Sequence, residues 1–201
     1  MKLYYSPGVC SLASHIVLNE SGFPFERVRV DIKKHELDDS SDYYTINPRG
    51  YVPLLELDDG QRLSEGQVIM QYVADLVPEK KLAPSWGTME RYRLNEWLAY
   101  TNSELHKNFG PLFNSDMPDA VKEYHRKRVL DRFCWMDAQL EGKQYIMGDT
   151  FTVADAYLFV VAGWGRFVGV DLSVFSNLAA VIQNIAARPA VQQTLKAEGL
   201  V

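Results

Sequence analysis

The feature that most constrains the fold is one change of hydrophobic periodicity along the chain. Before residue 78, short strand-like runs are mixed with helical spacing, and after residue 87 only helical spacing persists. The segment between them contains Pro78 and Pro84, which interrupt regular structure. We therefore expect an α/β domain at residues 1–80, a linker at residues 81–87 and an all-helical domain at residues 88–201, and 201 residues are enough for two such cores.

Local patterns place the elements of the N-terminal part. A strand-like run from Leu3 to Tyr5 turns through Ser6-Pro7-Gly8, and helical spacing then runs to Gly22, an expected C-terminal cap. Residues 26–30 alternate apolar and charged side chains, which predicts a half-buried strand. The other expected elements are a polar surface loop at 31–42, a short helix around 43–46 and a hairpin at 51–63 that turns through Asp58-Asp59-Gly60.

Cys10 is the leading candidate for chemistry in this part of the chain. It is expected in the first turn of the helix, where unpaired N–H groups and the positive end of the helix dipole favour a thiolate. A buried cysteine that acts as a small apolar residue is an equally valid interpretation of this stretch, because free cysteines are often buried. The local sequence leaves both interpretations open.

Two capping-box patterns mark the starts of later helices. Ser64 and Gln67 precede a helix at residues 68–76, whose free N–H groups form a potential anion site. Thr152 and Asp155 precede a helix that is apolar on nearly every side as far as Trp164, which predicts a buried central helix. The position of Asp155, three residues after the cap, favours a structural role over a catalytic one. Further helical faces are predicted at residues 94–112, 121–140, 178–187 and 190–197.

The composition excludes several classes of function. A net charge of -5 argues against nucleic-acid binding, and the basic cluster at residues 125–128 is interpreted as a solvated helix face. No secretory signal is visible, and the longest apolar stretch, 156–164, is far below the ~20 residues that cross a bilayer. These features and only two cysteines predict a cytoplasmic protein without membrane contact. The histidines and cysteines show no metal-ligand spacing, so no metal is expected.

Five motifs in order along the chain resemble the bacterial beta class of the glutathione S-transferases. Each is weak alone, and their agreement in order and spacing over most of the chain is what makes the resemblance specific. The motifs are Tyr4-Tyr5-Ser6-Pro7-Gly8-Val9-Cys10-Ser11-Leu12, Asn47-Pro48-Arg49-Gly50-Tyr51-Val52-Pro53, Ser64-Glu65-Gly66, Ser103-Glu104-Leu105-His106-Lys107 and Phe151-Thr152-Val153-Ala154-Asp155-Ala156-Tyr157.

The resemblance implies a fold and a set of partners. The N-terminal domain is expected to be thioredoxin-like, with a four-stranded mixed sheet and three helices, followed by a C-terminal helical bundle. Glutathione is the implied co-substrate, and a homodimer with two glutathione sites is the implied assembly. The Val52-Pro53 bond is implied to be cis, with the Val52 backbone facing the cysteinyl part of glutathione.

The resemblance also implies roles for individual residues. Cys10 and His106 are the expected catalytic pair, Cys10 facing the glutathione sulfur and His106 stabilising a thiolate or relaying its proton. By itself, a histidine on an amphipathic helix is more often a packed or solvated residue, and it is the match of Ser103-Glu104-Leu105-His106-Lys107 that favours the catalytic role. The expected glutathione-binding residues are Tyr5, Ser11, His35, Val52, Pro53, Glu65, Gly66, Asn102, Ser103 and Lys107. Core packing is a second explanation for Tyr5.

Three positions depart from the family pattern. His35 stands where many members carry a lysine, which leaves the contact to the glycyl carboxylate open. Ala99 stands where relatives often carry an asparagine, and Asn102, on the same helical face, is a substitute. Gly66 replaces a common serine and keeps only the backbone N–H.

We therefore expect a glutathione transferase that directs the thiolate at an apolar electrophile, including by displacement of halide. The electrophile pocket is expected between the domains, lined by Phe109, Phe113 and Trp164, although each also fits a core position. Thiol-disulfide or peroxide chemistry at Cys10 is a variant within the enzyme class. A non-catalytic ligand carrier or interaction module is the alternative. The sequence does not identify the physiological electrophile.

Overall fold

The computed structural model describes residues 1–201, which form two compact units. The first unit consists of Met1–Ala83 and Arg188–Val201, and the second of Pro84–Ala187. The chain first passes between the units at Ala83 and Pro84, inside the expected linker. Residues 188–201, which we had expected in the helical domain, pack instead with the N-terminal part.

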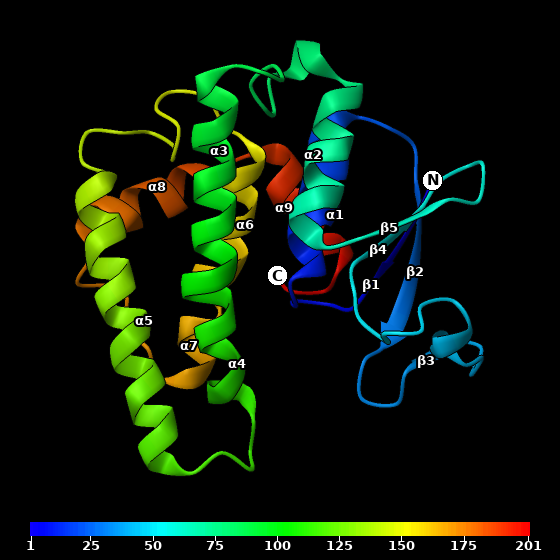
Figure 1. The fold of residues 1–201 in the computed structure, drawn as a ribbon, viewed down its shortest axis with the longest axis horizontal. Helices are drawn as coiled ribbons and strands as arrows, with labels where there is room; N and C mark the ends of the chain where they lie inside the picture. The colour runs from blue at the N-terminus through cyan, green and yellow to red at the C-terminus, as the bar shows by residue number, and fades with distance from the viewer. The chain divides into compact units, whose positions relative to one another are not determined.

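A mixed sheet with the strand order β3-β2-β1-β4-β5 supports the first unit (Figure 1). The strand β1 (Lys2–Tyr5) pairs parallel with β2 (Glu26–Asp31) and antiparallel with β4 (Leu54–Glu56). The strand β5 (Arg62–Ser64) returns antiparallel to β4. These are the four expected strands, and the Asp-Gly turn joins the last two as predicted.

The fifth strand, β3 (Glu36–Leu37), lies in the segment that was expected to be only a loop. His35 has a φ of 57°, and beyond this left-handed residue the chain turns back so that Leu37 pairs with Val30. The strand has only two residues and lies in a polar segment without alternation, so no pattern in the sequence predicted it. A 3-10 helix, η1 (Tyr43–Thr45), follows where the short helix was expected.

The helices of the first unit are α1 (Ser11–Ser21), α2 (Gly66–Leu76) and α9 (Pro189–Ala197), with a 3-10 turn η2 (Pro78–Lys80) after α2. The helix α1 packs against α2 and α9, and α1 and α2 contact the sheet (Figure 1). Buried residues therefore occur on nearly all sides of α1. Gly22 ends this helix with a φ of 79°, as predicted.

Polar contacts explain why α9 belongs to the first unit. Arg188 donates two hydrogen bonds to the Glu20 carboxylate, at 2.6 and 2.8 Å. Asn19 Nδ2 donates to Thr194 Oγ1 at 2.7 Å. Such a two-point arginine–carboxylate pair fixes orientation as well as distance.

The second unit is helical, as predicted. Its elements are α3 (Met89–Tyr100), the π-helical segment η3 (Thr101–His106), α4 (Lys107–Phe113), α5 (Asp119–Gln139), α6 (Val153–Gly163), α7 (Gly165–Val168) and α8 (Ser176–Ala186). The helix α6 is buried along almost its whole length and contacts α3, η3 and α8, which confirms the predicted central helix. The π-helical turn was not predicted, because the apolar spacing runs through it without interruption.

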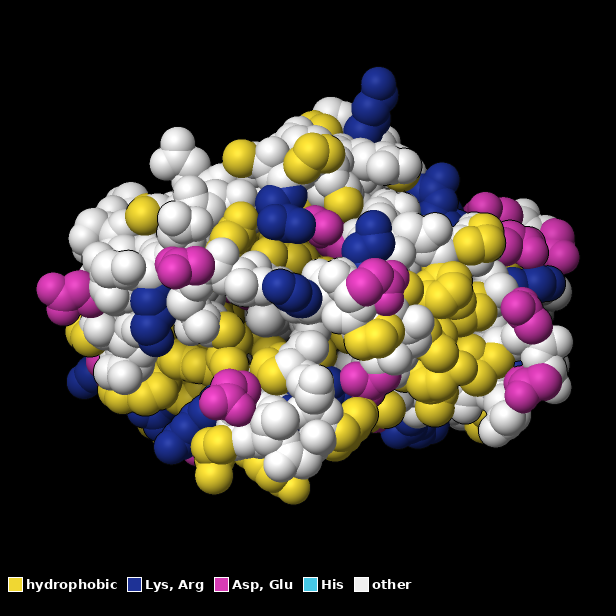
Figure 2. All heavy atoms as spheres, turned by 90° about the horizontal axis from the view of Figure 1, so that it is seen from above, with side chains coloured by type: hydrophobic (Ala, Val, Ile, Leu, Met, Phe, Trp, Pro, Cys, Tyr) yellow, Lys and Arg dark blue, Asp and Glu magenta, His cyan; other side chains and the backbone are white.

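The surface carries mixed charge. On the face that Figure 2 presents, acidic and basic side chains are interspersed with hydrophobic ones. The basic residues predicted to form a solvated face at 125–128 are exposed or half-buried, and two of them also have polar partners: Arg126 Nε donates to the Val168 carbonyl at 3.1 Å, and Arg128 lies 3.5 Å from the Glu104 carboxylate. None of the helices combines the length and hydropathy that a bilayer crossing requires.

Candidate active site

Cys10 lies at the junction between β1 and α1. The chain leaves β1 through a turn at Ser6-Pro7-Gly8, where Gly8 has a φ of 72°. The helix begins at Ser11, so Cys10 is its N-cap rather than a first-turn residue. The partly buried thiol donates a hydrogen bond to the Val52 carbonyl oxygen at 3.2 Å. Only a protonated thiol makes this bond, which connects Cys10 to the loop that begins β4.

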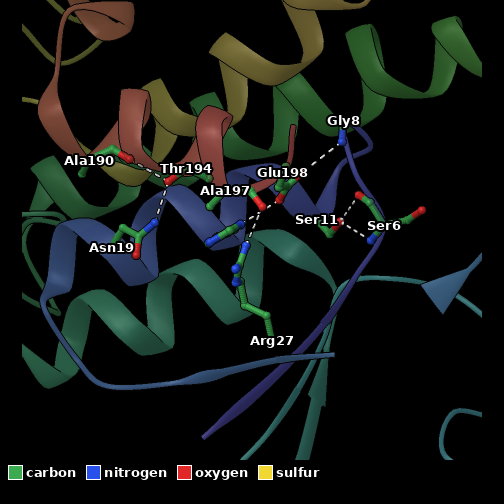
Figure 3. A network of polar contacts seen from close by, with 10 residues as sticks. Ser6, Gly8, Ser11, Asn19, Arg27, Ala190, Thr194, Ala197 and Glu198 are labelled. Carbon is green, nitrogen blue, oxygen red and sulfur yellow. Dashed lines mark hydrogen bonds and ion pairs between the residues drawn. The ribbon is translucent and has the colours of Figure 1, made fainter. Parts of the chain in front are cut away.

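A buried hydrogen-bond network holds the turn before Cys10 (Figure 3). The Gly8 N–H donates to Glu198 Oε2 at 2.9 Å, and the second carboxylate oxygen lies 2.7 Å from His15 Nδ1. Leu200 lies against the same glycine, so a Cβ there would meet it at 3.4 Å. The C-terminal segment therefore holds the turn before Cys10 through a residue 190 positions away in sequence. No local pattern in the sequence predicted this contact.

Tyr5 and Ser11, both predicted to bind glutathione, are part of this scaffold. Ser11 is fully buried, and its hydroxyl accepts from the Ser6 N–H and donates to the Ser6 carbonyl, each at 3.1 Å. Tyr5 is buried and its ring packs near the His15 ring. These contacts give both residues a structural role, and contact with a ligand remains a prediction.

The Val52-Pro53 peptide is cis, as the resemblance implied. Pro53 lies beside the start of α2, where a Cβ on Gly66 would stand 3.5 Å from the proline ring and 3.7 Å from Ser14 Oγ. The buried Ser14 hydroxyl has no hydrogen-bond partner within the chain. The absence of a side chain at Gly66 therefore leaves room between α1, Pro53 and the first N–H groups of α2.

The predicted capping box at Ser64 is wrong. Glu65 is the N-cap of α2, with a φ of 67°, and no side chain caps the helix. Arg49 instead hydrogen-bonds the Ser64 hydroxyl and pairs with Glu65 Oε1 at 3.1 Å. The first N–H groups of α2 thus lack the expected cap, and Arg49, which sequence analysis did not single out, orients the Glu65 carboxylate.

His35 lies in the loop before β3. Its Nδ1 is 3.2 Å from the Gly50 carbonyl oxygen, and its ring stacks at 4.5 Å on Tyr44. A Cβ on Gly50 would approach His35 Nδ1 to 2.7 Å, so the ring and the loop before Val52 fit closely together. The contact of His35 with a glycyl carboxylate stays a prediction.

The second unit carries the other predicted catalytic residue. His106 Nδ1 lies 2.7 Å from the Tyr157 hydroxyl oxygen, and that hydroxyl donates to Asn102 Oδ1 at 3.0 Å. The Trp164 ring packs edge-on against His106 with the centroids 4.8 Å apart. Tyr157 is the last residue of the motif Phe151–Tyr157, but the sequence did not predict a role for it.

The three aromatic residues predicted to line the electrophile pocket, Phe109, Phe113 and Trp164, form a cluster, but their side chains differ in solvent exposure. Phe109 and Phe113 both pack edge-on against Trp164, at 5.8 and 6.1 Å. Phe109 and Trp164 are buried, which favours the core interpretation for their rings, whereas Phe113 is 53% exposed. Ser103 and Lys107 lie on the surface of the same helical stretch. A separate hollow of about 440 Å³ borders α6 and α7 and is lined by other residues, including Arg166, Gly169 and Leu172.

Asp155 has the structural role that its spacing predicted. It forms a capping box with Thr152, and its other oxygen accepts the Ile146 N–H at 2.7 Å. Burial raises the pKa of the Asp155 carboxyl to about 6, against the opposing effect of hydrogen bonds from Ile146 and Thr152. We find no group of three or more His, Cys, Asp and Glu side chains that could hold a metal ion.

Comparison with known proteins gives one family for both units. The family models for the N-terminal and C-terminal domains of glutathione S-transferases match residues 9–76 and 100–189. Over the full length of both chains, the sequence is 46% identical to glutathione S-transferase GstA of Escherichia coli O157:H7.

Two solved structures match this chain over its full length and over the full length of their own chains. A sphingomonad glutathione S-transferase complexed with glutathione superimposes with a TM-score of 0.96 at 44% identity. A bacterial beta-class glutathione S-transferase of Sphingomonas chungbukensis also gives 0.96, at 46% identity.

Proposed function

This chain belongs to the glutathione S-transferase family, in its bacterial beta class, and is a glutathione transferase; from that premise we propose which residues hold glutathione and which act on its thiol. Glutathione is the co-substrate. The observation that carries the assignment is the hydrogen bond from Cys10 Sγ to the Val52 carbonyl, beside the cis Val52-Pro53 peptide and the start of α2. It brings together three separate motifs of the sequence.

Each part of glutathione matches one part of this arrangement. We propose that the Val52 backbone holds the cysteinyl residue and that Cys10 faces the glutathione sulfur. The α-carboxylate of the γ-glutamyl residue suits the free N–H groups of α2 from Gly66 onward, and its amine suits the Glu65 carboxylate. Arg49 keeps that carboxylate in place through its contact at 3.1 Å. His35 is assigned to the glycyl carboxylate.

His106 is assigned to the thiol and the aromatic cluster to the electrophile. A histidine can accept the thiol proton or stabilise the thiolate, which is the attacking species. Phe113, the exposed member of the aromatic cluster, offers an apolar surface to the electrophile. Asn102, Ser103 and Lys107 are assigned to glutathione on the family pattern.

The test combines binding with turnover. Cys10→Ala and His106→Ala are assayed for retention on immobilised glutathione and for conjugation of a chlorinated nitrobenzene. We expect conjugation to fall about 100-fold or more in His106→Ala, as for loss of a general base. Cys134→Ala, which removes the exposed cysteine of α5, is the matched control and should act as wild type. Wild-type conjugation in both variants would refute the site assignment, and binding without turnover on a wide electrophile panel would favour a ligand carrier.

A second activity has one observation in its favour: Cys10 is a partly exposed thiol at a helix N-terminus. We propose that it exchanges with oxidised glutathione, forming a Cys10–glutathione disulfide and releasing one reduced glutathione. Mass spectrometry of the intact protein should show one adduct, absent in Cys10→Ala. No adduct on the wild type would exclude this activity.

We further propose a cytoplasmic homodimer. Trp86, Met89 and Tyr92, which lie close together in sequence at the start of the second unit, all have exposed side chains, and neighbouring large apolar side chains on a surface are typical of an interface. Light scattering should give about twice 22.9 kDa. A monomeric mass at micromolar concentration would refute the dimer.

A further inference from the structure

Three polar side chains of the second unit, those of Asn102, Tyr157 and His106, are linked by hydrogen bonds. Asn102 and His106 come from η3, and Tyr157 comes from α6. The Tyr157 oxygen lies 2.7 Å from His106 Nδ1 and 3.0 Å from Asn102 Oδ1. In this π-helical segment the Lys107 N–H bonds to the Asn102 carbonyl, five residues back. Asn102 and His106 are four residues apart and both reach the same hydroxyl.

With the amide oxygen of Asn102 facing Tyr157, as in this structure, the hydrogen atoms among these three side chains can be placed in one way. An amide oxygen only accepts hydrogen bonds, so the single proton of the Tyr157 hydroxyl points at Asn102. The same hydroxyl has no second proton for His106, and its oxygen must accept there. The hydrogen between Tyr157 and His106 therefore belongs to Nδ1 of the imidazole.

We propose that Asn102 and Tyr157 are positioning residues that hold His106 in its Nδ1–H tautomer, so that Nε2 is the proton acceptor of the neutral ring. The tautomer of a histidine is set by the hydrogen bond that its other nitrogen makes. This inference rests on the proposed role of His106 and specifies which nitrogen acts. When a thiol gives its proton to Nε2, the S–H bond breaks, an N–H bond forms and the electron pair stays on sulfur.

The arrangement also suits the charged ring that follows. After Nε2 takes the proton, the imidazolium still donates through Nδ1 to the Tyr157 oxygen, so that hydrogen bond becomes charge-assisted and stronger. The Trp164 ring packs edge-on against the imidazole, and the Tyr157 ring does the same at 5.9 Å. These two contacts hold the plane of the ring while the proton is transferred.

The test is nitrogen-15 NMR of the histidine rings in the full-length apo protein, above the pH at which they titrate. His106→Gln assigns the His106 signals among those of four histidines. We expect the wild-type ring to carry its proton on Nδ1. In Asn102→Ala the Tyr157 hydroxyl can turn and donate to Nδ1, so we expect the proton on Nε2. Asn102→Asp keeps an acceptor oxygen and should keep the wild-type tautomer.

Kinetics give the second measurement. Tyr157→Phe and Asn102→Ala should each lower kcat for conjugation about 10- to 100-fold, up to the lower end of the range for loss of a general base, because the base is still present. In Tyr157→Phe, which alters no residue assigned to glutathione, KM for glutathione should change less than kcat. Tyr124→Phe is the matched control, because it removes an exposed tyrosine hydroxyl of the same unit that contacts Arg128 instead. It should leave the His106 tautomer and kcat unchanged.

The positioning role of Asn102 and Tyr157 and the proposed role of His106 can be refuted separately. A wild-type ring protonated on Nε2, or an unchanged tautomer in Asn102→Ala, overturns the positioning role whatever the activity. Full conjugation by His106→Gln refutes the proposed function of His106 and leaves the tautomer result valid. A lowered kcat in Tyr157→Phe with the Nδ1–H tautomer retained also overturns the inference, because the residue then acts in another way.

Discussion

At the scale of single residues, the side chains around Cys10 and His106 matter through their hydrogen-bond partners. Cys10 donates to the Val52 carbonyl, and His106 is linked through the Tyr157 hydroxyl to the Asn102 amide. Glu198 accepts from Gly8 and contacts His15 with its whole side chain buried. Removing such a buried group lowers the stability of the fold strongly, because its hydrogen-bond partners stay buried without a replacement.

Glu198→Ala should therefore be strongly destabilising. It leaves the Gly8 N–H and the buried His15 without their partner, and removal of one member of a buried pair costs about 3–5 kcal/mol in free energy of unfolding. Denaturant unfolding measures the loss. Glu26→Gln is the control, because the ion pair of Glu26 with Lys2 is exposed and should contribute less than about 1 kcal/mol. Equal effects of the two substitutions would contradict a stabilising role for the contacts of Glu198 with Gly8 and His15.

At the scale of elements, the two ends of α6 are the positions where the surrounding contacts most restrict which residue types fit. Its N-terminus carries the buried Asp155 capping box, and its C-terminus turns directly into α7 at Gly165. A Cβ on Gly165 would lie 2.8 Å from the Val170 carbonyl oxygen, whereas one on Gly163 meets nothing within 4 Å. Of these two glycines, only Gly165 lacks room for a side chain.

Gly165→Ala should destabilise the protein by about 1–3 kcal/mol, because the backbone of the α7 loop must move to admit the methyl group. Gly163→Ala should be neutral or raise stability by up to about 1 kcal/mol, since alanine loses less entropy in a helix. Thermal unfolding of both variants measures the contrast. The explanation fails if Gly165→Ala is as stable as Gly163→Ala.

Asp155→Asn should cost about 1–3 kcal/mol at pH 7, because an amide cannot accept all the hydrogen bonds that the carboxylate accepts. Folded Asp155 binds a proton below about pH 6, while an unfolded aspartate does so only near pH 4. Between these values the folded state binds more protons, so this group adds stability as the pH falls.

The advantage of the wild type over Asp155→Asn should therefore grow between pH 7 and pH 4, measured by urea unfolding at several pH values. Asp149→Asn, an exposed neighbour, should show a difference within about 0.5 kcal/mol at each pH. A difference between wild type and Asp155→Asn that stays constant with pH would contradict the raised pKa.

At the scale of the whole molecule, the chain returns to its first unit after building the second. The helix α9 packs on α1 and brings Glu198 and Leu200 to the turn before Cys10. The first unit is therefore incomplete without residues 188–201. Its integrity depends on both ends of the sequence.

Truncation after residue 187 should remove cooperative unfolding of the first unit and abolish retention on immobilised glutathione. The physical reason is that α1 loses its contact with α9 and the Arg188–Glu20 pair. Deletion of Val201 alone, which is 76% exposed, is the control and should change neither property. Wild-type unfolding and binding by the truncated chain would show that α9 is dispensable.

Much of the architecture followed from local sequence, because periodicity, turn residues and caps act over a few residues. The four main strands, the Gly22 cap, the Asp155 capping box and the central helix were all predicted in this way. The capping box at Ser64 was not formed, because Arg49 takes the Ser64 hydroxyl and Glu65 adopts a positive φ. A tertiary contact there overrode a local pattern.

What the sequence alone determined is the order of the elements and the residue types available for glutathione chemistry, since both are properties of short segments. Only the tertiary structure decided which groups share a proton or a charge: Cys10 with Val52, Gly8 with Glu198, and His106 with Asn102 through Tyr157. Hydrogen bonds depend on distances of about 3 Å between atoms, and residues far apart in sequence reach those distances only when the chain has folded.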